Sequence, residues 1–298
     1  MRAGVLFGIG AYGLWGLFPI YFHALDEAGS IEVVAHRIGW SLVVVIVLLA
    51  VTRKLHALRD LGGDRRTLLL LSTAAVLIAI NWGVYVYAVH AGHVIEAALG
   101  YFITPLISVA LGMSVFGERL RPAQAAALGL GTVAVIVLSV YYGGFPWIAL
   151  VLGASFGTYG LLKKLADVGA AESLAVETTV LFLPALAVIT ALAWAGEGAF
   201  AAGDLGLTLL LMLAGPVTAL PLLLFAACVT RVPLTVVGLL QYLTPVLQFL
   251  IGWLAYHELM STARWIGFAL VWLALIVLTF DGVRLARRAP IAPDATAI

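Results

Sequence analysis

The sequence predicts an all-α polytopic membrane protein with ten transmembrane helices, built as two inverted five-helix repeats with both termini in the cytoplasm. Three observations lead to this fold class. The chain is 63% hydrophobic and only 10% charged, whereas soluble domains carry about 25% charged residues. Its apolar residues fall into ten runs of membrane-spanning length. One of these runs, 95–116, has a sequence similar to that of the run 234–256.

The first five apolar runs approach the roughly 20 residues that a spanning helix needs. The first follows Arg2 and is too long for the apolar core of a signal peptide, so we expect it to be retained. A basic loop joins the second run to the third, and a tight connection at 141–145 follows the fifth. In chain order the five runs are 3–23, 33–52, 67–89, 95–116 and 122–140.

The remaining five runs have the same character. Lys163 and Lys164 close the first of them, and Arg231 separates the third from the fourth. All ten runs are apolar on every side, which favours helices over the alternating strands of a membrane barrel. In chain order these runs are 146–163, 173–195, 206–228, 234–256 and 263–281.

Basic residues set the direction of the chain, because cytoplasmic loops of membrane proteins are enriched in Lys and Arg. With the N-terminus inside, fourteen of the 16 Lys and Arg fall in cytoplasmic segments. Of the other two, Arg264 falls in an outer loop and Arg37 lies within a span. The remaining outer charges are acidic: Asp26, Glu27, Glu197 and Asp204. Both termini are therefore predicted to be cytoplasmic.

A segment near the end of each half carries nearly the same sequence. Residues 99–118 read LGYFITPLISVALGMSVFGE, and residues 239–258 read LLQYLTPVLQFLIGWLAYHE. Five helices per half is an odd number, so the second half enters the membrane from the opposite side. We expect 1–143 to form the first repeat (spans 1–5). We expect 144–298 to form the second, inverted repeat (spans 6–10), with a short basic C-terminal tail.

Pro105 and Pro245 interrupt the two copies at matching places. A proline removes a hydrogen bond inside a helix and crowds the preceding turn. In lipid the freed carbonyl must find a partner in protein or in cavity water. Paired helix-breakers in two halves indicate the binding site of a transporter. We predict that both prolines kink their helices beside a central cavity; a kink that only shapes packing is the alternative.

Three ionisable residues lie within predicted spans: Arg37, Glu96 and Glu177. A charge in the hydrocarbon costs roughly 3 kcal/mol or more unless it is paired or faces water, so each is a candidate for solute binding or proton coupling. His36 precedes Arg37, and the repeat aligns Arg37 with Glu177. If both face the cavity, they would form a charge pair or hold a solute between them. Snorkelling toward an interface is the alternative.

Polar and aromatic residues add further candidates for the lining of the cavity. Asn81 and Trp82 lie inside the third span, and Tyr101, Gln241 and Tyr242 lie close to the two prolines. An amide within a span needs a partner, and aromatic rings stack on planar solutes. Cavity lining and ordinary helix packing are both open interpretations.

No feature of the sequence indicates a metal, a cofactor or an enzyme. His90, His93 and Glu96 form H-x-x-H-x-x-E, a spacing that would place three zinc ligands on one helical face. A helix connection and Gly92 fall inside it, so we expect no metal there. The nucleotide-binding and metalloprotease motifs are absent. A net charge of +1 gives no indication of a nucleic-acid partner.

Several motifs resemble those of RarD-type permeases, in the EamA branch of the drug/metabolite transporter superfamily. The most specific are A-Y-x-x-W-G-x-x-P-x-Y-F at 11–22, H-R-x-x-W-S at 36–41, E-A-x-L-G-Y-F-I-x-P-L at 96–106 and Q-Y-x-x-P at 241–245. The resemblance covers nearly the whole chain. It implies a ten-helix inverted-repeat protein that moves small metabolites or drugs across the bacterial cytoplasmic membrane.

We therefore expect a secondary transporter, or permease, that moves a small metabolite or drug-like solute by alternating access. A membrane sensor or scaffold that binds a solute without moving it is the alternative. The expected partners are that solute and the lipid bilayer, and a homodimer is left open.

Overall fold

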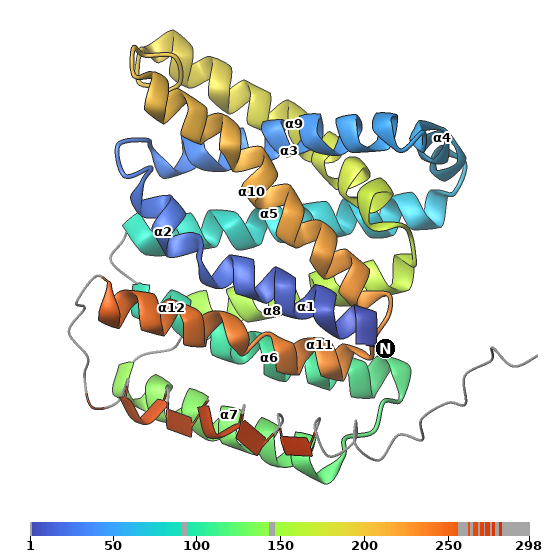
Figure 1. Cartoon of the computed structure of the whole chain (residues 1–298), viewed down its shortest axis with the longest axis vertical. Coiled ribbons are helices and arrows are strands. Elements are labelled where there is room, and N and C mark those ends of the chain that lie inside the picture. The colour runs from blue at the N-terminus through green and yellow to red at the C-terminus, as the bar shows by residue number, and fades with distance from the viewer. Residues whose placement is uncertain are drawn as a thin grey trace, which may run out of the picture.

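The computed structural model describes residues 2–90, 94–142, 147–255 and part of 262–281. Every element in these ranges is a helix (Figure 1). In chain order they are α1 (Arg2–Gly16), α2 (Phe18–His23), α3 (Ser30–Val51), α4 (Leu55–Gly62), α5 (Arg65–His90), α6 (Val94–Phe116), α7 (Pro122–Tyr142), α8 (Trp147–Ala166), α9 (Ala170–Ala195), α10 (Leu205–Val229), α11 (Leu234–Leu240) and α12 (Leu243–Leu254).

The expectation of an all-helical polytopic membrane protein is confirmed. Within the described residues, six helices are long and apolar enough to cross a membrane, and four further apolar helices are shorter. Two predicted spans are divided: 3–23 at Leu17, between α1 and α2, and 234–256 at Gln241-Tyr242, between α11 and α12. The short helix α4 within the basic loop was not predicted. The predicted span 263–281 lies partly outside the described residues, and its described residues are helical.

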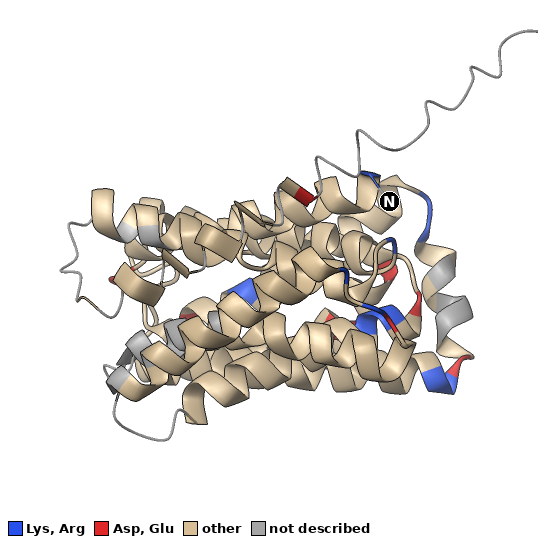
Figure 2. Cartoon of the chain, turned by 90° about the horizontal axis from the view of Figure 1, so that it is seen from below, with Lys and Arg blue, Asp and Glu red and all other residues tan. Residues whose placement is uncertain are grey.

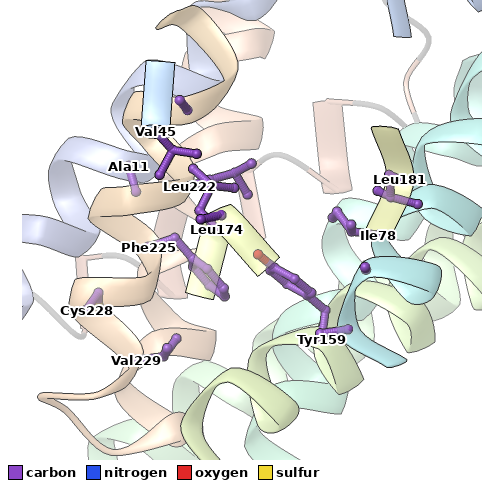
Figure 3. Close-up of a cluster of buried hydrophobic side chains, with 14 of the residues drawn as sticks. Ala11, Val45, Ile78, Tyr159, Leu174, Leu181, Leu222, Phe225, Cys228 and Val229 are labelled. Atoms are coloured by element: carbon purple, nitrogen blue, oxygen red, sulfur yellow. The ribbon is translucent and has the colours of Figure 1, made fainter. Parts of the chain in front are cut away.

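The helices pack as one bundle with a layered order (Figure 1). Helix α3 packs against α9 and α10 at one edge, α8 packs against α5 and α6 in the middle, and α1 packs against α10 and α12. Helix α7 lies at the opposite edge beside α6. The largest buried cluster joins α1, α3, α5, α8, α9, α10 and α11. Figure 3 shows part of it, with Tyr159, Leu174 and Phe225 converging from α8, α9 and α10.

Charged side chains gather at one end of this bundle. Lys and Arg lie mainly at the end where the N-terminus is found (Figure 2). The segments that reach this end include the start of α1, the end of α8 with Lys163 and Lys164, and the turn after α10 with Arg231. The bundle therefore has one basic end and one end with few basic residues.

Helices α3 and α10 approach each other closely at Gly215. A Cβ atom added to Gly215 would lie 2.5 Å from the carbonyl carbon of Trp40 and 2.6 Å from its oxygen. Both are backbone atoms of α3, so they cannot move aside as the end of a side chain would. Ser41 of α3 adds to this contact, because its Oγ donates a hydrogen bond to the Gly215 carbonyl at 3.2 Å. Gly215 thereby fixes the spacing of the two helices.

We expect Gly215→Ala to destabilise the protein by about 1–3 kcal/mol, because the added methyl group overpacks a backbone contact. Thermal unfolding of the detergent-solubilised protein measures the effect. Gly39→Ala is the matched control, since a Cβ at Gly39 on α3 meets no atom within 4 Å. Equal unfolding temperatures for the two variants would contradict the assigned role of Gly215.

Candidate functional site

A cavity of ≈ 100 Å³ lies among α1, α2, α3, α5, α6, α8 and α12. Five of the residues that the sequence analysis singled out line it: Arg37, Asn81, Trp82, Tyr101 and Gln241. Its walls come from the last two turns of α1, the second half of α5 and the first halves of α3, α6 and α8. Because the basic end holds the opposite ends of these helices, the cavity lies toward the end with few basic residues.

Arg37 is the charged centre of the cavity wall. Its side chain is buried, with 7% exposure, and its Nε donates a hydrogen bond to Thr218 Oγ1 of α10 at 2.9 Å. The guanidinium carbon lies 4.6 Å from the ring centroid of Trp82, 5.4 Å from that of Phe22 and 5.6 Å from that of Phe18. Aromatic faces attract a cation at these distances. The guanidinium is thus held in place by one hydrogen bond and three rings.

The position of Thr218 follows from the contact between α3 and α10. Thr218 lies three residues after Gly215, hence on nearly the same face of α10. Arg37 likewise lies about one turn before Trp40 on α3. The close approach at Gly215 therefore brings Thr218 within bonding distance of Arg37.

Asn81 and Tyr101 contribute in different ways. The amide nitrogen of Asn81 donates to the Leu152 carbonyl at 2.9 Å and to Ser155 Oγ at 3.0 Å, which ties α5 to α8. Tyr101 of α6 packs near Tyr85 of α5, with ring centroids 6.2 Å apart. Asn81 thus shapes the cavity by holding its wall, and the two tyrosines close one side of it.

Asn81→Ala should lower the free energy of unfolding by about 1–3 kcal/mol, because the truncation removes both hydrogen bonds that Asn81 donates to α8, although the Leu152 carbonyl keeps the Ser155 hydroxyl as a donor. Thermal unfolding in detergent measures this loss. Thr73→Ala on the same helix is the control, since its hydroxyl bonds only to an exposed carbonyl one turn back. A loss no larger than that of the control would contradict the tie between α5 and α8.

Gln241 occupies the break between α11 and α12. Its side chain is buried and exchanges hydrogen bonds with Ser108 of α6, at 3.3 and 3.5 Å. Directly after the break, Thr244 Oγ1 donates to the Tyr12 carbonyl at 2.9 Å and Gln248 Nε2 donates to the Trp15 carbonyl at 3.2 Å. The start of α12 is therefore fastened to α1.

The sequence analysis did not single out several residues of the cavity wall. Tyr12 and Trp15 lie in a motif that was used only for the family resemblance, and Thr244 was used only to align the repeats. Gln248 offered a direct signal, because an amide inside an apolar run needs a polar partner. All four line the cavity.

Glu177 lies outside the cavity wall, and the expected pairing with Arg37 is not formed. Its carboxylate accepts hydrogen bonds from Lys163 Nζ at 2.5 Å, Tyr159 Oη at 2.9 Å and Ser173 Oγ at 3.0 Å. Lys163 also donates to Ser173. Lys163 and Glu177 are 3% and 2% exposed. The short connection between α8 and α9 brings the end of α8 against the start of α9, so the nearest cation to Glu177 is Lys163.

His36 and Tyr242 also lie away from the cavity. His36 Nδ1 accepts from Trp40 Nε1 at 3.2 Å, and its ring lies 4.6 Å from that of Phe200. It therefore faces the connection between α9 and α10. The Tyr242 hydroxyl points to α7, where a Cβ on Gly131 would meet it.

The two prolines occupy different local structures. Pro105 lies inside α6, which continues through it to Phe116. Pro245 lies in the first turn of α12, where a missing N–H costs no helical hydrogen bond. Neither lines the cavity, although the adjacent Thr104 and Thr244 do. Glu96 belongs to α6, but its side chain, like those of His90 and His93, lies outside the described set.

A cluster of polar contacts closes the basic end of the bundle. Glu118, just after α6, accepts hydrogen bonds from the backbone N–H groups of Leu234 and Thr235, both at 2.8 Å. Lys164 Nζ lies 3.3 Å from Glu118 and donates to the Val232 carbonyl at 2.9 Å. We call Glu118, Lys164, Val232, Leu234 and Thr235 the closed end. They join α6 and α8 to the start of α11.

Ionised Glu118 is stabilised in this cluster. Burial raises the pKa of its carboxyl, but the backbone N–H groups of Thr235 and Leu234 and the charge of Lys164 lower it, and the net pKa lies below its ordinary value. The contacts of Glu118 with Leu234, Thr235 and Lys164 are therefore fully formed above that ordinary pKa and are lost as pH falls through the lowered one.

Comparison with known proteins is consistent with this architecture. Residues 2–140 match the EamA-like transporter family. The chain is 51% identical to Protein RarD of Streptomyces exfoliatus, over 99% of this chain and 94% of that protein. It is 40% identical to the uncharacterized transporter YojE of Bacillus subtilis, over 96% of each. A solved structure described only as the crystal structure of a protein shares the fold, with a TM-score of 0.71, 20% identity and coverage of 96% of this chain and 99% of that one.

The identity and coverage of these relatives exceed what a shared fold alone would require. The relatives are transporters and not enzymes. The all-helical apolar bundle, its cavity and these matches agree: the chain belongs to the EamA-like transporter family, among the RarD proteins.

Proposed function

We propose that the protein is a secondary transporter that moves a small solute across the bacterial cytoplasmic membrane by alternating access. The observation that carries the proposal is the unequal state of the two ends of the bundle. The cavity reaches toward the end with few basic residues, while Glu118 and Lys164 hold the basic end closed. A transporter of this kind exposes one site to each side in turn.

The positions of the basic residues support an orientation with both termini inside. Lys and Arg gather at the end that holds the N-terminus (Figure 2), as expected for the cytoplasmic side. In this orientation the closed end is cytoplasmic and the cavity faces outward. The structure is then an outward-facing state.

The packing of the helices supports two inverted repeats, 1–143 and 144–298. If α1 corresponds to α8, α3 to α9 and α5 to α10, the two halves exchange equivalent contacts. Helix α1 packs on α10 as α8 packs on α5, and α3 packs directly on α9. Likewise α6 packs on α8 as α11 and α12 pack on α1. Two halves joined in this way can rock about the cavity between them.

Accessibility of an introduced cysteine tests alternating access. Cys228 is the single cysteine of the chain and is buried in α10, so Cys228→Ala provides the background. In that background, Gln248→Cys should react with a membrane-impermeant maleimide added outside, and much more slowly from inside. Leu49→Cys, at a buried position of α3 away from the cavity, is the unreactive control.

Glu118→Gln should raise the rate at which Gln248→Cys reacts from the cytoplasmic side several-fold, because the variant removes the charge that holds Leu234, Thr235 and Lys164. Acidifying the cytoplasmic face of inside-out vesicles below the lowered pKa of Glu118 should raise the rate for Gln248→Cys in the Cys228→Ala background relative to the rate with Glu118→Gln added at the same pH. This comparison cancels the slower reaction of a protonated thiol. The maleimide rate from each side measures both. A cysteine that stays one-sided in Glu118→Gln would contradict alternating access and favour a solute sensor.

A further inference from the structure

The cavity contains a cation with unused hydrogen-bond donors. A guanidinium carries five N–H donors, and Arg37 uses Nε for Thr218. Within the described part of the chain, its two terminal nitrogens make no hydrogen bond. Buried polar groups are normally satisfied, so the four remaining N–H donors at the cavity wall suit an acceptor on a solute that enters the cavity.

The described carboxylates near the bundle centre have partners elsewhere. Glu32 accepts from the backbone N–H groups of Ala199 and Phe200, at 2.9 to 3.0 Å. Glu177 is held by Lys163, as described above. No described carboxylate contacts Arg37, so the described part of the cavity lining carries a positive charge.

The other amide donors of the cavity are already used. Asn81 bonds to α8, and Gln248 bonds to the Trp15 carbonyl. The hydroxyls of Thr104 and Thr244 donate to the carbonyls of Gly100 and Tyr12. Among the described charged groups of the wall, the free donors therefore belong to Arg37, and the neutral hydroxyl of Tyr12, which also lines the cavity, has no partner among the described residues either.

We propose that the transported solute is a small organic monoanion, whose carboxylate binds the two terminal nitrogens of Arg37 and whose flat apolar part lies among the cavity aromatics. The proposal rests on the transport function proposed above and names its substrate class. Arginine suits a carboxylate because its planar fork matches two oxygens. An anion also compensates a cation that is costly to leave alone within a membrane.

The aromatic rings argue for a flat apolar part. Trp82 and Phe22 pack against the guanidinium, and Trp15 and Phe156 add two further rings, 5.5 Å apart between centroids. Rings in such walls bind another ring by stacking or edge contact. The cavity volume of ≈ 100 Å³ restricts the solute to a small molecule.

The single cation argues for one negative charge. A phosphate monoester carries about −1.5 to −2 at neutral pH, and among the described lining residues Arg37 alone is cationic. Its second charge would stay unpaired in an apolar site. A carboxylate carries one negative charge, so none is left unpaired.

Binding to the purified full-length protein in detergent tests the proposal with four ligands of similar shape. These are benzoate, its neutral amide benzamide, the cation benzamidine and phenyl phosphate. Isothermal titration should show benzoate binding about tenfold or more tighter than benzamide, the factor expected for hydrogen bonds to a charged group. Phenyl phosphate should bind more weakly than benzoate, and benzamidine should not bind.

Arg37→Gln should abolish the preference for benzoate over benzamide. Arg231→Gln is the matched control, because it makes the same substitution at an exposed arginine of the basic end. The proposal is overturned if benzamide binds as tightly as benzoate, or if Arg37→Gln keeps the preference while its unfolding temperature shows a folded protein. If that variant fails to fold, Thr218→Val, which removes only the acceptor for Nε, should reduce the preference instead.

Flux in proteoliposomes separates this inference from the transport function. If benzoate binds through Arg37 but is not transported, the transport function is contradicted and carboxylate binding by Arg37 is still supported. If a neutral or cationic solute is taken up independently of Arg37, the proposal of a monoanionic substrate is contradicted and the transport function is still supported.

Discussion

Lys163→Met is expected to destabilise the protein by about 3–5 kcal/mol, the range found when one partner of a buried ion pair is removed. Lys163 and Glu177 are almost fully buried, and the substitution leaves the Glu177 carboxylate with only Tyr159 and Ser173 as donors. Two neutral hydroxyl donors do not compensate a full charge away from water. Thermal or denaturant unfolding of the detergent-solubilised protein measures the change.

The double variant Lys163→Met/Glu177→Gln should recover most of this loss. Replacing a buried ion pair as a whole is often neutral, and a glutamine keeps an acceptor for Tyr159. Lys164→Met is the neighbouring control, because the Lys164–Glu118 pair is partly exposed and such pairs contribute up to about 1 kcal/mol. A double variant as unstable as the single one would show that packing, not charge, causes the loss.

Arg37→Lys should reduce solute affinity at least tenfold although it preserves the charge. The ammonium of lysine offers no planar fork, so it cannot hold both carboxylate oxygens as a guanidinium does. Nor does it reproduce the hydrogen bond of Nε to Thr218 and the stacking on Trp82 at the same time. Titration with benzoate and concentration-dependent flux measure the change.

Concentration-dependent flux separates the effect of Arg37 on holding the solute from the effect of its charge. With Arg37→Lys, a raised concentration for half-maximal flux with little change in the maximal rate would show weakened binding of the solute. Unchanged affinity would instead show that Arg37 acts as a point charge, and would remove the bidentate contact from the proposed site. The unfolding temperature should stay close to that of the natural protein, because a buried cation is retained.

Much of the fold could be predicted because bilayer thickness and backbone satisfaction limit what a long apolar run can do. Predicted runs such as 33–52 and 173–195 agree with α3 and α9 within a few residues at most ends. The break at Gln241 was less accessible. It occurs inside continuous apolar sequence, where the contacts of Gln241 with Ser108, and of the next helix with α1, decide where the helix stops. The break at Leu17 comes just before Pro19, which lies in the first turn of α2, so here the sequence held a signal that the prediction did not use.

The site was partly predictable for a related reason. Arg37 was found because a charge within an apolar run is costly, and Trp82 and Tyr101 because aromatic residues deep in a span are unusual. The pairing of Glu177 was missed because alignment of the repeats relates equivalent positions, whereas contacts depend on which helices pack together. Lys163 was counted among the cytoplasmic basic residues at the end of the span 146–163, yet the tight connection to α9 buries it.

The break at Gln241-Tyr242 has a consequence for how the protein changes state. In the proposed repeats, Tyr101-Phe102 of α6 occupies the equivalent position, and there the helix is continuous. One molecule therefore displays two shapes of a single duplicated segment, interrupted in one half and uninterrupted in the other. For the inward-facing form we expect the two halves to exchange these shapes. Helix α6 would be interrupted beside Tyr101, and α11 and α12 would join into one continuous helix. In that form each half would take the shape that the other half has in this structure.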